Sequence, residues 1–259
     1  MVLSNGSVGA NGKTELVYTI ENVKRDETLQ CGDKVALPPD GKLKSVFFSE
    51  NGDPVIFDSD GVVLVLQHWR SPGQARWVPL LDTKQLERPT GSDEEYWPVA
   101  VAQDKFHCII LKRGEKHPYF PRPLLSEFEF KVPLTATPKD VNNSNPLHAV
   151  QTHEETIARE TVLLSLLEDF VGTRPATSDE GHQKAQRENA IDKALLQLLA
   201  IECRDDHGEK ALELCGLFRQ PARTLDLAVK IAVKYGRGVL AEKIGRLRES
   251  LDFDMTMEF

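Results

Sequence analysis

The side chains best suited to chemistry, histidine and cysteine, lie along this 259-residue chain without the spacing that a metal site requires. The seven histidines, none with HExxH or HxxxH spacing, are His68, His107, His117, His148, His153, His182 and His207. The four cysteines, none in a CxxC pair, are Cys31, Cys108, Cys203 and Cys215. A structural zinc site needs four convergent ligands, usually in two close pairs. We therefore expect no metal site, and free thiols in a reducing compartment.

Carboxylates and sequence motifs give no better indication of catalysis. The sequence contains no GxSxG, P-loop or GxGxxG pattern. The carboxylate pairs Glu154–Glu155 and Asp205–Asp206 are adjacent in the sequence, which is typical of solvated faces and helix caps. We predict that the protein is not an enzyme and uses no cofactor.

Two stripes of residues show a pattern that suits binding instead. The first stripe consists of Lys193, Leu196, Ala200 and Arg204. The second consists of Arg223, Leu227, Ile231 and Lys234. Steps of three and four residues put each stripe on one face of a helix, with an apolar centre and a basic residue at each end. If the two stripes face one another, they form a shallow apolar groove with basic rims, which suits an amphipathic helix with acidic residues at its end. The alternative is that Leu196 and Leu227 belong to a helical core and the basic residues snorkel around it.

The elements that carry these stripes are predicted by apolar residues three and four apart in the second half of the chain. Five short helices are expected, over about 146–170, 178–203, 208–219, 221–236 and 239–251. The first begins at Pro146, and Thr177 and Glu180 have capping-box spacing before the second. Short connections imply antiparallel neighbours in a compact bundle. No internal repeat of fixed period is visible in the sequence.

The first half of the chain has the turns and aromatic strands of a β-protein. The turns Asn51-Gly52 and Asp60-Gly61 join strands expected over 43–49, 55–58 and 62–69, and residues 76–80 supply a fourth. A four-stranded meander is the unit of a propeller blade. The strands amount to about two blades and parts of a third, too few to close a ring. The predicted fold class is β plus α: a partial β-propeller followed by a five-helix bundle.

The domain boundaries follow from these shifts in composition. We expect a disordered start over 1–13, the partial propeller over 14–134, a linker over 135–145, the bundle over 146–251 and a tail over 252–259. The stretch Leu251–Phe259 alternates acidic and apolar residues, and is either a frayed end or a short linear motif that docks elsewhere.

Charge and hydropathy exclude some classes of partner. The net charge of −8 argues against a general nucleic-acid-binding surface. The start has no basic region or apolar run of signal-peptide length, and no stretch approaches the roughly 18 apolar residues of a membrane helix. We expect an intracellular, soluble protein with no membrane contact.

Several stretches, taken together, resemble one known family. They are Trp77–Thr83, Glu95–Val99, Pro121–Pro123, Leu195–Cys203 and Leu227–Ala232. The family is the replisome adaptor known in filamentous fungi as SepB, in yeast as the chromosome transmission fidelity adaptor, and in animals as the acidic nucleoplasmic WD-repeat/HMG-box protein. The resemblance extends over roughly residues 25–250.

This resemblance implies a nuclear scaffold that acts in DNA replication and sister chromatid cohesion. In the family, a six-bladed second propeller forms a homotrimer, and the helical bundle captures short helical motifs of its clients. The clients are a GINS-type subunit of the replicative helicase and the catalytic subunit of DNA polymerase α. The chain resembles the later blades of that propeller plus the whole bundle, so the homotrimer is an expectation for the full-length family.

The resemblance also bears on the two stripes. Leu196, Ala200, Leu227 and Ile231 match the family's client-binding positions, the second pair after one inserted residue. This match favours the groove over the core interpretation. The basic rim, Lys193, Arg204, Arg223 and Lys234, is inferred from spacing and charge alone. The alternative function is a chromatin- or DNA-binding propeller module with weak DNA contact, which the acidic balance of the chain disfavours.

Overall fold

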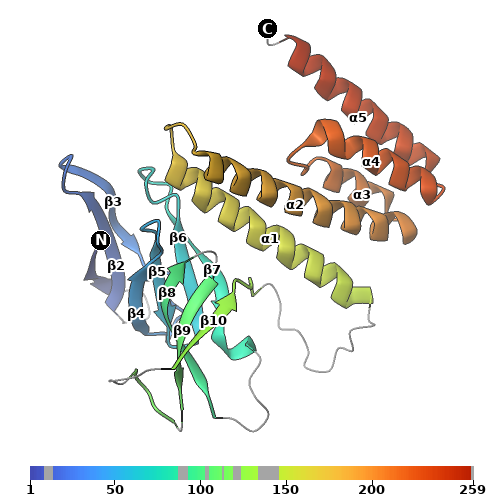
Figure 1. Cartoon of the computed structure of the whole chain (residues 1–259). Helices are drawn as coiled ribbons and strands as arrows, with labels where there is room; N and C mark the ends of the chain where they lie inside the picture. The colour runs from blue at the N-terminus through green and yellow to red at the C-terminus, as the bar shows by residue number, and fades with distance from the viewer. Residues whose placement is uncertain are drawn as a thin grey trace. The chain divides into compact units, whose positions relative to one another are not determined.

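The computed structural model describes most of the chain as strands followed by helices (Figure 1). The described residues are 1–8, 14–86, 93–102, 105–112, 114–118, 124–133 and 146–257. The predicted linker over 135–145 and the motif at 121–123 lie outside them. The chain divides into two compact units. The first contains Met1–Leu134 and Ser165–Thr173, and the second contains Thr135–Leu164 and Arg174–Phe259.

Three antiparallel sheets make up most of the first unit. The first sheet contains β1 (Val2–Val8), β2 (Thr14–Asn22) and β3 (Glu27–Lys34), in that order. The second contains β4 (Leu43–Phe48), β5 (Pro54–Asp58), β6 (Val62–Gln67) and β7 (Arg76–Asp82), in that order. The third has the order β10 (Leu124–Glu129), β9 (Lys105–Leu111), β8 (Glu95–Ala102). A short 3₁₀ helix, η1, covers Thr83–Gln85. The predicted β-plus-α order is confirmed.

The β4–β7 meander forms where the turn residues predicted it. Gly52 and Gly61 have φ of 81° and 89°, which glycine adopts without steric cost. At the second turn, Asp58 Oδ1 accepts hydrogen bonds of 2.9 Å from the backbone N–H groups of Asp60 and Val62. All five residues of β5 are buried, so this inner strand of the meander is covered on both faces.

The start of the chain corrects one prediction. Residues 1–13 were expected to be disordered, but Val2–Val8 form β1 and pair with β2, with Leu3 opposite Tyr18. Leu3 packs against the buried cluster that contains Tyr18. The polar residues of β1 gave no strand signal because β1 is an edge strand with most of its residues exposed.

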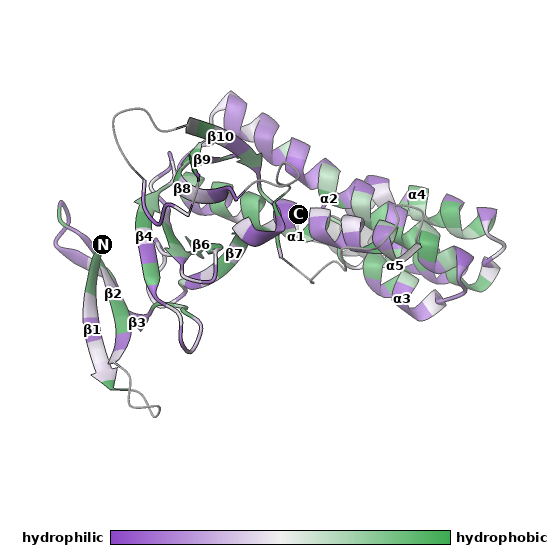
Figure 2. Ribbon diagram, turned by 90° about the horizontal axis from the view of Figure 1, so that it is seen from below, coloured by the Kyte–Doolittle hydropathy of each residue, from purple (hydrophilic) through white to green (hydrophobic). Residues whose placement is uncertain are grey.

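Five helices follow, as predicted. They are α1 (Pro146–Val171), α2 (Ser178–Arg204), α3 (Gly208–Cys215), α4 (Pro221–Lys234) and α5 (Gly238–Met257). The capping box is present: Glu180 N–H donates to Thr177 Oγ1, and Thr177 N–H donates to Glu180 Oε2 at 2.8 Å. Helix α5 continues past its expected end at Leu251 into the predicted tail. Figure 2 shows apolar and polar residues alternating along α4 and α5.

The core of the second unit is built from the apolar faces of these helices. Its fully buried members include Leu195, Leu199, Leu225 and Ile244. Within the part of the chain that the structure describes, no helix combines the length and the apolar character needed to cross a bilayer.

The turn between α2 and α3 has a defined hydrogen-bond pattern. Asp205 N–H donates to the Ile201 carbonyl, and His207 N–H donates to the Glu202 carbonyl. Between the two donors, Asp206 has a φ of 66°. This left-handed residue, with paired bonds back into the helix, is the geometry of a Schellman-type helix end.

The turn between α4 and α5 repeats this pattern 30 positions later in the sequence. Tyr235 N–H donates to the Ile231 carbonyl, Arg237 N–H donates to the Ala232 carbonyl, and Gly236 has a φ of 72°. The ends of α2 and α4 therefore share one backbone geometry, 30 positions apart. The residue in the left-handed conformation is Asp206 at the first turn and Gly236 at the second.

Within the first unit, the last turns of α1 are held to the β-structure by Arg70. Its Nη1 lies 2.8 Å from Asp53 Oδ1 and 2.9 Å from Asp169 Oδ2, and its Nη2 donates to the Asn51 carbonyl at 2.6 Å. The guanidinium also lies 4.2 Å from the centre of the Trp69 ring. The carboxylates of Asp53 and Asp169 are almost fully buried, and they share the single positive charge of Arg70.

We expect the substitution Arg70→Met to lower the free energy of unfolding of the first unit by about 3 kcal/mol, because it removes the cation that pairs with two buried carboxylates. Urea unfolding followed by tryptophan fluorescence measures this, since Trp69, Trp77 and Trp97 all lie in this unit. The matched control is Arg76→Met at an exposed position, which should change stability by less than about 0.5 kcal/mol. Equal effects of the two substitutions would contradict this role for Arg70.

Candidate binding groove

A pocket of about 410 Å³ lies between α2 and α4. Its lining residues are Asn189, Asp192, Lys193, Leu196, Gln197, Ala200, Gln220, Arg223, Thr224, Leu227 and Ile231. All four predicted groove positions and two of the four predicted rim residues, Lys193 and Arg223, are among them. Arg204 and Lys234 are not. We call this pocket the groove.

The walls of the groove are joined by Asp192 of α2. Its buried carboxylate accepts hydrogen bonds from the backbone N–H groups of Arg219 and Gln220, at 2.7 and 3.0 Å. It also accepts one from Thr224 Oγ1 at 2.9 Å. A carboxylate at these N–H groups satisfies donors that a helix leaves unpaired and complements the helix dipole. Asp192 therefore fixes the start of α4 against the middle of α2.

Asp192 is a site residue that the sequence analysis missed, although two signals pointed to it. It is a charged residue among the apolar residues of α2, next to the buried Ile191. In addition, Gln220 at the N-cap of α4 makes no side-chain capping bond, and Pro221 follows it. A helix start of this kind needs an acceptor from elsewhere in the chain.

The floor of the groove is apolar. Leu196 and Ile231 are partly buried and pack against the core of the second unit, while they also line the groove. Leu227 is 41% exposed. Leu196 therefore contacts the core on one side and lines the groove on the other, whereas Leu227 is not part of the core. Leucine side chains held open in this way leave apolar area that a partner can remove from water.

The basic residues of the rim fall into two pairs. Lys193 and Arg223 are 30 positions apart, as are Arg204 and Lys234, so the members of each pair precede the left-handed positions 206 and 236 by the same number of residues. Among the described residues, neither Lys193 nor Arg223 forms an ion pair. Arg204 is paired with Asp205 at 2.8 Å, and Lys234 lies 6.0 Å from the centre of the Tyr235 ring. The unpaired positive charge of the groove is therefore concentrated at the end formed by Lys193 and Arg223.

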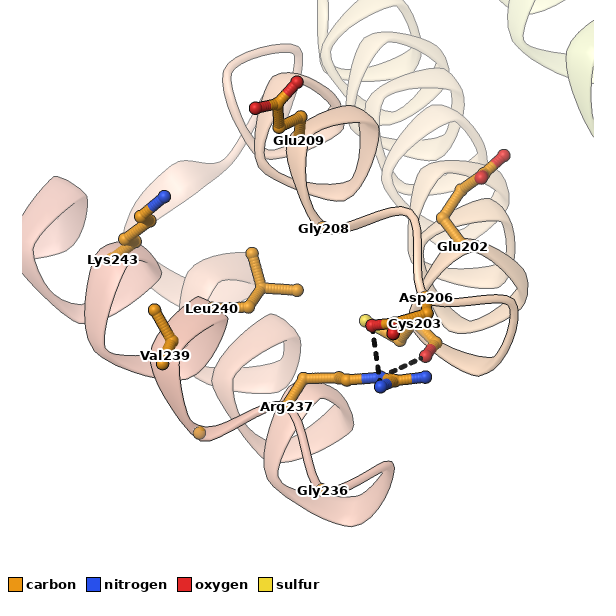
Figure 3. Close-up of a pocket in the computed structure, with 11 residues that line it drawn as sticks. Glu202, Cys203, Asp206, Gly208, Glu209, Gly236, Arg237, Val239, Leu240 and Lys243 are labelled. Carbon is orange, nitrogen blue, oxygen red and sulfur yellow. Dashed lines mark hydrogen bonds and ion pairs between the residues drawn. The ribbon is translucent and has the colours of Figure 1, made fainter.

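A second pocket, of about 380 Å³, lies where the end of α2 meets the starts of α3 and α5 (Figure 3). Glu202 is buried there, with Oε1 2.6 Å from Lys210 Nζ and Oε2 2.8 Å from His207 Nδ1. Burial alone would raise the pKa of Glu202, but the hydrogen bonds from Lys210 and His207 outweigh it and hold the pKa below its ordinary value. Arg237 donates to the Cys203 carbonyl at 2.8 Å and pairs with Asp206. These charges are satisfied within the protein and hold the α2–α3 and α4–α5 turns together.

The buried thiols are not activated. Burial raises the pKa of Cys108 to about 12 and that of Cys215 to about 12, and it also raises the pKa of Cys203. These thiols are protonated at neutral pH and are poor nucleophiles. The described residues contain no group of three or more His, Cys, Asp or Glu side chains that could hold a metal ion.

An apolar floor between two helices with free positive charge at one end is typical of surfaces that bind amphipathic helices. The comparisons with known proteins also point to a family of binding proteins.

Residues 1–134 match the family model described as minichromosome loss protein, Mcl1, middle region. Residues 151–252 match the model described as DNA polymerase alpha-binding protein Ctf4, C-terminal domain. The chain belongs to the Mcl1/Ctf4 family, and the predicted resemblance is confirmed.

Curated relatives from fungi and animals are longer than this chain, and each matches it over only part of its own length. Minichromosome loss protein 1 of Schizosaccharomyces pombe is 47% identical over 247 residues, which cover 95% of this chain and 30% of the relative. The DNA polymerase alpha-binding protein of Saccharomyces cerevisiae is 34% identical, over 80% of this chain and 26% of the relative. The human WD repeat and HMG-box DNA-binding protein 1 is 26% identical, over 89% of this chain and 19% of the relative. The chain thus spans less than a third of the length of each.

The bonds of Asp192 lead to a stability prediction. Asp192→Ala leaves the backbone N–H groups of Arg219 and Gln220 without their acceptor, while Thr224 Oγ1 can still donate to the Gln220 carbonyl. The free energy of unfolding of the helical unit should therefore fall by about 2–3 kcal/mol. Urea unfolding followed by the helical circular dichroism signal measures this. The control is Asp226→Ala on the exposed side of α4, for which we expect a loss below about 1 kcal/mol. If Asp192→Ala were as mild as the control, Asp192 would not be the residue that fixes α4.

Proposed function

We propose that this chain is a non-enzymatic adaptor module whose groove binds short amphipathic helices of client proteins. The observation that carries the proposal is that six of the eight residues predicted from helical spacing line one pocket between α2 and α4. The floor offers apolar side chains at steps of four residues on both walls, Leu196 and Ala200 on one, Leu227 and Ile231 on the other. A client helix laid between them would pack as a third helix.

The charge at one end of the groove supports a direction for the bound helix. On α2, Lys193 precedes Ala200, and on α4, Arg223 precedes Ile231. Both basic residues therefore lie on the N-terminal side of the apolar floor. Acidic residues are most stable in the first turn of a helix. A client helix that begins with acidic residues would therefore lie with its start beside Lys193 and Arg223, and with its apolar residues on the floor. Arg204 and Lys234 then lie beyond the far end and contribute less.

The proposed clients follow from the family. One relative is named as a DNA polymerase alpha-binding protein, and another as a minichromosome loss protein. We propose that the module binds the catalytic subunit of DNA polymerase α and a GINS-type subunit of the replicative helicase. It would thereby link helicase to polymerase in the nucleus, in DNA replication and sister chromatid cohesion.

We also propose that the three sheets are blades of a larger propeller. The β4–β7 sheet has the four-stranded meander of a blade, and the other two sheets have three described strands each. The remaining blades would lie in the part of the relatives that this chain does not span. If that complete propeller forms a homotrimer, three weak sites of about micromolar affinity would act together on clustered clients.

The test is a double substitution in the groove. Ala200→Glu combined with Ile231→Glu puts two carboxylates on the floor, and we expect the affinity for an acidic amphipathic helical peptide from a polymerase α or helicase subunit to fall at least about thirtyfold. Fluorescence anisotropy with the labelled peptide measures the affinity, and circular dichroism checks that the helices remain folded.

The matched control adds the same two charges outside the groove. Leu217→Glu combined with Val233→Glu changes two side chains that are 58% and 61% exposed, and neither lines the groove. This variant should bind the peptide like the unsubstituted protein. Equal binding by both folded variants would refute the groove as the client site.

A further inference from the structure

We propose that the outer face of α4 binds the sugar–phosphate backbone of duplex DNA. This inference goes beyond the proposed function and does not depend on it. The first observation is a local reversal of charge in the helical unit. Residues 219–248 contain eight basic and two acidic side chains, a net charge of +6 in a chain of net charge −8, so the rest of the chain carries −14. The acidic balance of the whole chain therefore conceals a strongly basic segment.

Ion pairs neutralise three of the eight cations and use both acidic residues of the segment. The pairs are Arg237 with Asp206, Arg246 with Glu242, and Arg248 with Asp226. Within the part of the chain that the structure describes, the five cations that form no ion pair are Arg219, Arg223, Lys230, Lys234 and Lys243. The segment thus presents positive charge that its own carboxylates do not neutralise.

Three of the free cations form a line along α4, which we call the ridge: Arg223, Lys230 and Lys234. Their spacing of i, i+7 and i+11 places them within about 40° of one another around the helix axis, over a length of about 17 Å. All three residues are exposed. Ala228 and Ala232, which are fully buried in the core, occupy the opposite face of α4. The ridge therefore faces solvent, and Arg223 at its start also lines the groove.

The ridge matches a regular row of phosphates better than it matches an acidic protein. Duplex DNA carries one negative charge per about 1.7 Å of its axis, so a length of about 17 Å holds about ten phosphates. Each ridge cation can reach one of them whatever the base sequence. Basic residues in a stripe along a helix are typical of nucleic-acid-binding surfaces, whereas lysine is depleted from protein–protein interfaces.

The residue types of α4 also favour double-stranded over single-stranded nucleic acid. Proteins that hold single strands stack the bases on aromatic side chains, and Pro221–Lys234 contains no aromatic residue. A duplex keeps its bases stacked on one another and offers its backbone to the cations. Contacts of this kind fix the position of the protein on DNA without reading its sequence.

The number of ridge cations sets the expected salt dependence. Each neutralised phosphate releases counterions, so the logarithm of the association constant falls with the logarithm of the salt concentration, with a slope of about −0.9 per contact on duplex DNA. Three contacts give a slope of about −2.7. We expect the same slope for duplexes of different sequence.

The experiment removes two ridge charges in the full chain by Lys230→Gln with Lys234→Gln. We expect the slope to change from about −2.7 to about −0.9, and the association constant at about 50 mM salt to fall at least about tenfold. Fluorescence anisotropy of a short labelled duplex over a range of salt concentrations measures both quantities. Circular dichroism checks that the helices remain folded. An unchanged slope in the folded variant would overturn the proposal.

The matched control removes two cations of α5, Lys243→Gln with Arg246→Gln, and so has the same net charge. Lys243 lines the second pocket, and Arg246 is already paired with Glu242. This variant should bind the duplex within about twofold of the unsubstituted protein, because the phosphate contacts of the ridge are intact. Equal losses in the two variants would show that only net charge matters, and the ridge would be refuted.

Competing ligands test the class of partner. Polyglutamate of the same total charge should displace the labelled duplex less effectively than unlabelled duplex does, and a single strand of the same sequence should bind more weakly than the duplex. Equal displacement by polyglutamate would assign the ridge to acidic proteins, and tighter binding of the single strand would assign it to single-stranded nucleic acid. Either result would overturn the proposal. Because no client peptide is present in these measurements, they are independent of the test of the groove.

Discussion

The helical unit depends on a buried carboxylate that joins two helices far apart in the sequence. Asp192 accepts three hydrogen bonds at the start of α4, where the chain supplies no local cap. Because these bonds are directional, they set both the distance and the rotation of α4 relative to α2. The groove exists only as long as that relation holds, since one wall is Leu196 and Ala200 and the other is Leu227 and Ile231.

The basic residues of the predicted rim differ in their relation to the groove. Lys193 and Arg223 both line it, and Arg204 and Lys234 do not. Asp205 pairs with Arg204, while Lys193 and Arg223 have no carboxylate partner among the described residues. The free positive charge that lines the groove therefore lies at one end, which gives a bound helix a preferred direction.

The features that could be predicted from the sequence are those that depend on neighbouring residues or on periodic spacing. Helical spacing found the stripes, the capping box at Thr177 marked the start of α2, and the glycines at 52 and 61 marked the turns of the meander. The rest depended on long-range geometry. The bonds of Asp192 join residues 27 to 32 positions apart, and the ends of α2 and α4 share backbone torsions although their side chains differ. Strand β1 had no apolar pattern to reveal it, because its pairing with β2 supplies its stability.

The most direct test of the groove is to locate the contact of a client helix residue by residue. Methyl-labelled isoleucine and leucine spectra of the protein would be recorded while an acidic amphipathic helical peptide from a polymerase α or helicase subunit is added. We predict saturable shifts of the methyl groups of Leu196, Leu227 and Ile231, with little change at Leu240 in the second pocket. Shifts centred on Leu240, with the methyl groups of the groove unchanged, would contradict the account.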